Sequence, residues 1–254
     1  MPAPNLLTMK LRRGQQSHAS SAFQDAAGRS LRHCFLTEIV RMWVRGMLVI
    51  GLTGGVASGK TTVSEVLREE GAILIDADQI ARELVQPQTP AWQELVEVFG
   101  NGILDRDGSI HRQKLASLIF SNPRQRSLLN RILHPRIKEE IGRRLKGIQQ
   151  RDPGAMVVID APLLIETGGH REMDKVIVVV CTETQQIERL RRRNQLSEEQ
   201  ARAMLSSQMS LDEKTTVADY VIGNEGSLEE TRQKARDVFR ELKRIALQPK
   251  GHTA

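Results

Sequence analysis

Five short apolar runs recur along the chain after residue 46, and stretches with helical spacing separate them. The runs cover residues 47–52, 72–78, 156–162, 175–180 and 220–222. They are rich in β-branched residues and continuous rather than alternating, which is typical of strands buried on both faces of a parallel sheet. The pattern therefore predicts an α/β fold of three layers, with helices covering both faces of a parallel sheet.

Between residues 84 and 150 the strand pattern disappears and helical spacing replaces it. We expect a helical insertion over 85–150, within a core formed by 47–84 and 151–250. Turns are predicted at residues 100–102, 105–108 and 122–123, from their Gly, Asp, Asn and Pro. Three capping boxes mark later helix starts: Thr182 with Gln185, Ser197 with Gln200, and Ser227 with Glu230.

Residues 54–61 read G-G-V-A-S-G-K-T and follow the first apolar run directly. This is the phosphate-binding loop pattern, in which glycines let backbone N–H groups approach the phosphates. Lys60 would bring positive charge to the β- and γ-phosphates, and Thr61 would offer a hydroxyl to Mg²⁺. The helix that follows points its positive end at the anion. An ordinary glycine turn is the alternative, and the flanking strand and helix argue against it.

Acidic residues follow two of the predicted strands. Asp76 and Asp78 end the 72–78 run, and their spacing places both carboxylates on one face of a strand. The carboxyl ends of parallel strands line the ligand crevice, so one carboxylate could help hold Mg²⁺ or orient an acceptor hydroxyl. The alternative is that Asp78 caps a helix starting at Gln79. Asp160 ends the next run, where a second metal-binding aspartate of such enzymes would lie.

Two further polar features stand on predicted helices. Arg189, Arg192 and Arg193 share one helix face and could bind phosphate, or could be a solvated face. His134 precedes Pro135, and these residues alone indicate a helix terminus with a surface histidine.

Five motifs together resemble the dephospho-coenzyme A kinase family. They are L-T-G-G-V-A-S-G-K-T-T-V, I-D-A-D-Q-I-A-R, L-L-N-R-I-L-H-P-R-I, A-P-L-L-I-E and A-D-Y-V-I-G-N-E-G-S, and the resemblance covers about residues 47–246. It implies a P-loop NTPase fold with a helical substrate-binding insertion and a helical lid at about 183–210. The implied reaction moves the γ-phosphate of ATP, with Mg²⁺, to the ribose 3′-hydroxyl of dephospho-CoA, the last step of coenzyme A synthesis.

The resemblance also assigns roles to residues. Lys60, Asp78, Arg189 and Arg193 would be catalytic, with Asp78 orienting or deprotonating the hydroxyl. Asp78, Arg82 and His134 would bind the acceptor, while Thr61 and Asp160 would serve the metal. The residues assigned to ATP are Gly55, Val56, Ala57, Ser58, Gly59, Lys60, Thr61, Thr62 and Asn224.

Three positions depart from the family pattern. Ala57 stands where glycine is usual, which requires that its φ stay below zero. Asn194 replaces the aspartate that usually follows the lid arginine, and Gly223 replaces the one before Asn224. We expect altered local hydrogen bonding with the chemistry intact.

The net charge of +6 comes mostly from residues 1–46, which carry seven Lys or Arg and two acidic residues. This basic segment lies outside the family pattern, and we expect it to be disordered. It resembles a transit peptide, and the same composition would arise from upstream sequence translated from an early start codon. Aromatic residues make up 3% of the chain, so few side chains could stack on nucleic-acid bases, and we expect no nucleic-acid partner.

No apolar run is long enough for a membrane span, no secretory signal is visible, and two lone cysteines suit a reducing compartment. We therefore expect a cytoplasmic enzyme, acting as a monomer. Rival functions are a different small-molecule P-loop kinase, a GTP-dependent switch, and a nucleic-acid ATPase. The switch would need a guanine-reading N-K-x-D segment, which the sequence lacks.

Overall fold

The computed structural model describes residues 46–120 and 122–247. They all belong to one unit, which runs from Glu38 to Ala254. The predicted disordered extension over residues 1–46 lies outside the described residues, apart from Gly46.

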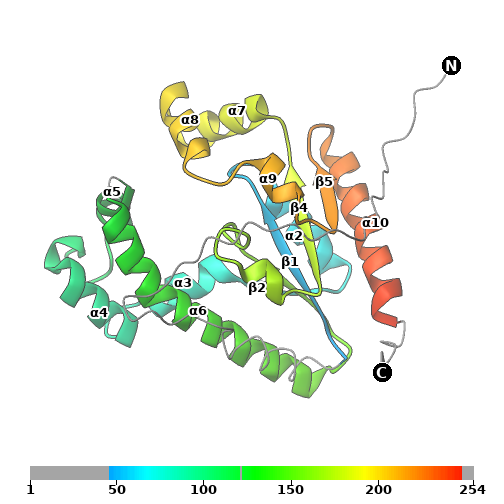
Figure 1. The fold of residues 1–254 in the computed structure, drawn as a ribbon, viewed down its shortest axis with the longest axis horizontal. Coiled ribbons are helices and arrows are strands. Elements are labelled where there is room, and N and C mark those ends of the chain that lie inside the picture. The colour runs from blue at the N-terminus through cyan, green and yellow to red at the C-terminus, as the bar shows by residue number, and fades with distance from the viewer. Residues whose placement is uncertain (1–45, 121, 248–254) are drawn as a thin grey trace, which may run out of the picture. The chain divides into compact units, whose positions relative to one another are not determined.

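Five strands form one parallel sheet, which confirms the predicted fold class (Figure 1). The strand order is β2-β3-β1-β4-β5, so the first strand lies at the centre. All five apolar runs become strands: β1 Leu48–Gly54, β2 Ile73–Asp76, β3 Met156–Asp160, β4 Lys175–Val180 and β5 Tyr220–Gly223. Every residue of β1 is buried, as expected of a central strand covered on both faces.

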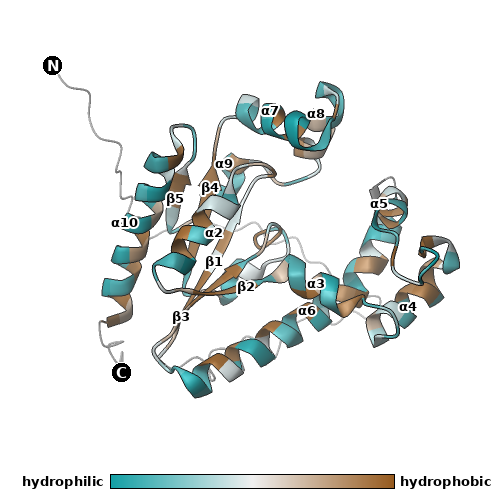
Figure 2. Cartoon of the chain, turned by 180° about the vertical axis from the view of Figure 1, so that it is seen from behind, coloured by the Kyte–Doolittle hydropathy of each residue, from teal (hydrophilic) through white to brown (hydrophobic). Residues whose placement is uncertain are grey.

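Helices cover both faces of this sheet. On one face, α2 (Lys60–Glu69) and α10 (Leu228–Leu247) pack on alternate residues of β1, β3 and β4. On the other face, α3 (Ala77–Leu84) and the C-terminal half of α6 (Pro123–Arg151) pack on the intervening residues. In Figure 2 the strands are brown, while α10 turns a teal side outward. The hydrophobic pattern therefore sets the three layers.

The insertion has a hydrophobic core of its own. It consists of α4 (Pro90–Phe99), the 3₁₀ turn Asn101–Ile103, α5 (Arg112–Phe120) and the N-terminal half of α6. Its buried residues are Leu95, Ile103, Ile110, Leu115 and Ile132. The long helix α6 thus joins this small core to the sheet, since its Leu145 and Ile148 pack under β1 and β3.

Helices α7 (Glu183–Asn194) and α8 (Glu198–Ser206) make up most of the segment predicted to be a lid, named the lid region below, and α9 (Leu211–Thr215) leads back to β5. The capping boxes predicted at Thr182, Ser197 and Ser227 are confirmed. A fourth box, between Ser210 and Glu213, begins α9 and was not predicted. The lid helices hold together through buried Ile187, Leu190 and Ala201.

Candidate active site

The predicted phosphate-binding loop joins β1 to α2. Gly59 lies in the left-handed region with φ 90°, and α2 begins at Lys60 with no side-chain hydrogen bond capping its first turn. A Cβ at Gly59 would lie 1.9 Å from Nδ2 of Asn224, so only glycine fits there. The first amides of α2 are thus left to an anion, which is what a phosphate site requires.

The backbone conformation of Ala57 differs from the one predicted, so that prediction was wrong. Its φ is 57°, where a negative value was expected. This conformation costs an L-residue about 1–2 kcal/mol. The loop keeps its shape because Ala57 packs against the buried cluster of the lid region, and because its carbonyl accepts a hydrogen bond from Arg189 Nη1 at 3.3 Å.

We expect the two simplest changes at Ala57 to act in opposite directions. Ala57→Gly should raise the free energy of unfolding by up to about 1 kcal/mol, because glycine adopts this φ without strain. Ala57→Val should lower it by about 2 kcal/mol, because a β-branched residue is strained there. Urea unfolding of both variants measures the difference. A valine variant as stable as the wild type would contradict the strained backbone.

A charged cluster lies where β2 and β3 end, beside the phosphate-binding loop. Lys60 Nζ forms an ion pair with the carboxylate of Asp160, and both side chains are largely buried. Asp160 pairs in register with Asp76 of β2, and Asp78 follows in the first turn of α3. One lysine therefore faces three carboxylates at the carboxyl edge of the sheet, where open α/β sheets bind ligands.

Desolvation is the main cause of the pKa shifts of Asp160 and Asp78. Burial raises the pKa of the Asp160 carboxyl, although the neighbouring Lys60 ammonium opposes the shift. The pKa of the Asp78 carboxyl is also raised by desolvation, more than Lys60 lowers it, and Asp76 adds to the rise. Asp78 is exposed as a residue, and its carboxylate interacts with the charges of Lys60, Asp76 and Arg82. Such paired perturbation is typical of functional sites.

The prediction that Asp76 and Asp78 share a strand face was wrong. Strand β2 ends at Asp76, whose carboxylate accepts a hydrogen bond from the amide of Gln79 at 2.9 Å and starts α3. Asp76 therefore makes the helix cap that was considered for Asp78. This leaves the Asp78 carboxylate available to a ligand at the crevice.

The predicted acceptor residues lie on α3, one turn after Asp78, and on α6. Arg82 is exposed on α3. His134 lies inside α6, which continues through Pro135, so the predicted helix terminus was wrong. Desolvation lowers the pKa of His134, and Lys138 lowers it further, which favours the neutral imidazole. His134 lines an open groove of about 530 Å³, with Pro123, Arg126, Ser127, Asn130, Arg131 and Pro135.

The two lid arginines do different things in this structure. Arg189 donates to the carbonyls of Ala57, Ser58 and Asn224, at 3.3, 3.4 and 3.0 Å. Arg193 is exposed, and its Nε donates to Oδ1 of Asn194 at 2.8 Å. The asparagine that replaces the family's usual aspartate thus keeps a hydrogen bond to the arginine.

Asn224 is buried behind the phosphate-binding loop. Its Nδ2 donates to the Ser58 carbonyl at 2.8 Å, and its Oδ1 accepts from Thr231 Oγ1 at 2.9 Å. Its backbone amide donates to the Val180 carbonyl at 2.7 Å. The side chain therefore braces the loop against α10, a role that the sequence pattern did not indicate.

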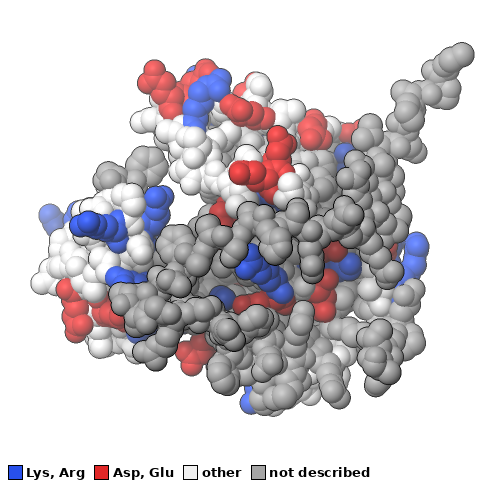
Figure 3. All heavy atoms as spheres, viewed as in Figure 1, with Lys and Arg blue, Asp and Glu red and all other residues white. Residues whose placement is uncertain are grey.

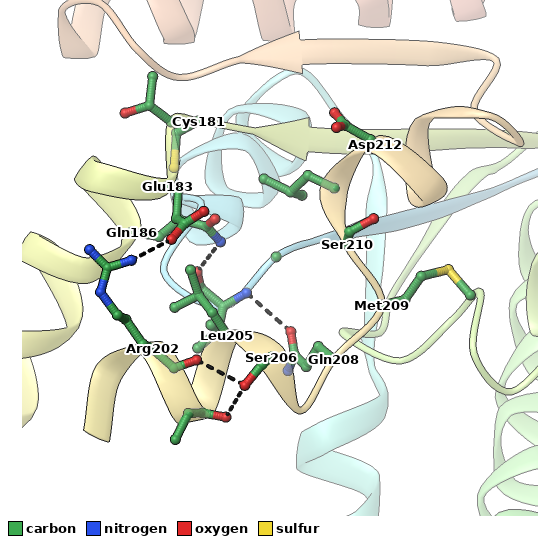
Figure 4. Close-up of a pocket in the computed structure, with 15 residues that line it drawn as sticks. Cys181, Glu183, Gln186, Arg202, Leu205, Ser206, Gln208, Met209, Ser210 and Asp212 are labelled. Carbon is green, nitrogen blue, oxygen red and sulfur yellow. Dashed lines mark hydrogen bonds and ion pairs between the residues drawn. The ribbon is translucent and has the colours of Figure 1, made fainter. Parts of the chain in front are cut away.

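Two glutamines join the lid region to the loop. Gln186 Nε2 donates to the Val56 carbonyl at 2.6 Å, and Gln208 Oε1 accepts from the Val56 amide at 3.2 Å. Figure 4 shows both side chains beside the loop, at a hollow of about 700 Å³ between the loop and the helices α7 to α9. Sequence reasoning missed both residues, because a single glutamine on a helix (Gln186) or in a turn (Gln208) carries no distinctive pattern.

The charge of the surface and the apolarity of the helices bear on whether the protein could bind nucleic acid or span a membrane. Figure 3 shows basic and acidic side chains side by side over the lid and over the insertion. Within residues 46–120 and 122–247, no helix combines the length and apolarity that crossing a bilayer requires.

Fold and site together define the class. A strand, a phosphate-binding loop and an uncapped helix lie beside paired carboxylates, in a parallel sheet with a helical insertion and lid helices: this is a P-loop kinase. The profile described as dephospho-CoA kinase matches residues 48–230. The chain therefore belongs to the dephospho-CoA kinase family, and it is a kinase that phosphorylates dephospho-CoA with ATP, the final step of coenzyme A biosynthesis.

Relatives share most of this length. The dephospho-CoA kinase of Bacillus cereus is 47% identical over 185 residues, which cover 73% of this chain and 92% of that protein. The one of Symbiobacterium thermophilum is 46% identical, covering 76% and 81%. Among solved structures, TT1252 of Thermus thermophilus aligns with a TM-score of 0.66 at 30% identity, over 77% and 97% of the two chains. Dephospho-CoA kinase of Campylobacter jejuni aligns at 0.53 and 27%, over 78% and 98%.

Proposed function

We propose that phosphoryl transfer takes place at the carboxyl edge of the sheet, between the phosphate-binding loop and α3. The observation that carries this proposal is the Lys60–Asp160 ion pair with Asp78 beside it. Residues 55–62 and Asn224 serve ATP, with Lys60 turning from Asp160 to the β- and γ-phosphates. Phosphoryl transfer depends chiefly on positioning and charge neutralisation, and this cluster provides both.

Asp78 acts on the acceptor hydroxyl. Its carboxylate accepts the hydrogen bond of the ribose 3′-hydroxyl and takes up the proton as the new oxygen–phosphorus bond forms. The bond between the γ-phosphorus and the bridging oxygen breaks, and ADP leaves with that oxygen. Arg82 and His134 hold the rest of dephospho-CoA on the insertion side. Arg189 and Arg193 stabilise the charge on the transferring group when the lid closes and excludes water.

Mg²⁺ fits the residues that the site offers. Thr61 is exposed in the first turn of α2, and Asp160 presents a carboxylate beside Lys60. Within residues 46–120 and 122–247, no three His, Cys, Asp or Glu side chains form a metal cage. Magnesium commonly takes one or two protein ligands and completes its shell with water and substrate phosphates. Thr61 and Asp160 would hold the ion, which neutralises phosphate charge when bound.

We also infer that the enzyme works as a monomer in the cytoplasm. Among the described residues, Cys181 is a buried free thiol, as in a reducing compartment. Sedimentation of the purified chain tests the first point, and localisation of the tagged protein tests the second.

Turnover with different acceptors tests the proposed function directly. A chain beginning at Met47 is expected to release ADP from ATP and Mg²⁺ only when dephospho-CoA is supplied, with coenzyme A as product. A nucleoside monophosphate and shikimate serve as matched acceptors, and the full chain serves as the reference. Equal turnover with a nucleoside monophosphate would overturn the acceptor assignment. Activity of the full chain alone would show that residues 1–46 are needed.

A further inference from the structure

Lys214 of α9 is the most deeply buried charged side chain among the described residues. Its exposed fraction is 0%, and its ammonium donates to three acceptors. These are the carbonyls of Gly54 at 3.3 Å and Pro162 at 3.0 Å, and the carboxylate of Glu166 at 2.8 Å. An ammonium has three donors, so all three hydrogen bonds of Lys214 are used inside the protein.

Two of these acceptors belong to the segments that carry Lys60 and Asp160. Gly54 is the last residue of β1 and the first of the phosphate-binding loop, which leads to Lys60. Pro162 follows Asp160 by two residues, and its carbonyl also accepts from Thr53 Oγ1 at 3.0 Å. Lys214 therefore bridges the start of the loop that leads to Lys60 and the segment that follows Asp160, and Lys60 and Asp160 form the ion pair of the site.

The bridge comes from the segment that returns from the lid. Helix α9 begins at the capping box of Ser210 and Glu213, directly after Gln208 contacts the loop at Val56. Figure 1 shows α9 lying over β4 and β1, between α8 and β5. The end of the lid is thus fixed to the loop and to the Asp160 segment through one ammonium group.

We propose that Lys214 is a positioning residue for phosphoryl transfer: it sets the distance between the phosphate-binding loop and the Asp160 strand end, and it anchors the lid's return segment. A hydrophobic side chain of similar volume would fill the same space without the desolvation penalty of a buried ion. What the lysine adds is a fixed geometry among three acceptors from separate segments. The inference rests on the proposed phosphate role of the loop.

Lys214→Met tests it, with Glu166→Gln as the matched control. Misplacement by about an ångström can lower turnover about a hundredfold, so we expect a loss of that order in kcat for Lys214→Met. The KM for ATP should rise and the KM for dephospho-CoA should stay unchanged, because the acceptor side is built on other helices. A merely structural role would reduce the amount of active enzyme without this difference between the two KM values. Glu166→Gln keeps an acceptor for Lys214 but removes its counter-ion, so it should lower stability while the folded enzyme stays within about twofold of wild-type kcat.

A double variant covers the case in which Lys214→Met does not fold. Lys214→Met/Glu166→Leu removes the unpaired carboxylate as well, so the fold should be restored while the bridge between Gly54 and Pro162 remains absent. Persistent loss of kcat with a raised KM for ATP supports the proposal. Wild-type kinetics in either Lys214 variant would overturn it. Failure of the proposed function is distinguished by Lys60→Ala, which would then keep its activity.

Discussion

Replacing Lys60 with alanine is expected to lower kcat by about a hundred- to a thousandfold. The structure places the Lys60 ammonium against the Asp160 carboxylate at the end of the phosphate-binding loop. Removing a preorganised charge or donor that acts on the transition state has effects of this size. ATP should bind more weakly as well, because Lys60 also meets the ground-state phosphates. Coupled ADP release at saturating dephospho-CoA measures the first effect, and nucleotide titration measures the second.

The matched control is Lys243→Ala. Lys243 is exposed on α10, so this change removes the same charge from the chain without touching the site. It should leave kcat and both KM values at the wild-type level. If Lys60→Ala and Lys243→Ala were equally active, the proposed role of the ion pair would be wrong, whatever their stabilities.

Hydrophobic patterning was sufficient to predict the sheet, because its strands are buried on both faces and must be continuously apolar. The runs in β1, β3 and β4 contain almost nothing but aliphatic residues, and each became a strand. The run 72–78 is three residues longer than the edge strand β2, since Ala72 precedes the strand and Ala77 and Asp78 follow it. Ala77 and Asp78 already belong to the first turn of α3, because Asp76 caps that helix.

The phosphate-binding loop could be located by motif, but its internal supports could not. Lys214 stands between acidic and hydroxyl residues in a short helix, a context typical of a solvated surface. Its burial depends on how α9 packs over the ends of β1 and β3, which is a tertiary feature. The same holds for Gln186, Gln208 and Asn224, whose hydrogen bonds reach loop carbonyls and amides far away in sequence.

Ala57 shows that the backbone conformation of a loop residue was also beyond prediction from the sequence. The general phosphate-loop motif allows any residue there, although glycine is usual in the family. Alanine in its place led to the expectation of a negative φ, whereas the observed φ is 57°. The buried cluster of the lid region contributes the packing that holds this strained residue. The shape of the loop therefore depends on the lid as well as on its own glycines, and lid and loop should respond together to ligands.

Asp78→Asn is expected to reduce kcat by at least about a hundredfold while ATP binding is kept. General acid–base groups contribute on the order of a hundred- to ten-thousandfold, and the amide cannot take up the proton of the 3′-hydroxyl. The folded pKa of Asp78 is raised above its ordinary value. Its contribution to stability is therefore present below the ordinary pKa and is lost as pH rises through the folded pKa. At neutral pH the asparagine variant should be at least as stable as the wild type, which thermal unfolding measures.

Asp76→Asn is the matched neighbour for this test. Asparagine caps α3 as well as aspartate does, so the fold should persist and most of the activity should remain. The negative charge of Asp76 raises the pKa of Asp78. Its removal should move the acid limb of the kcat profile to lower pH, since activity is lost as Asp78 becomes protonated. An acid limb unchanged in Asp76→Asn, or one still present in Asp78→Asn at measurable turnover, would assign that limb to another group. Full turnover in Asp78→Asn would remove Asp78 from the reaction.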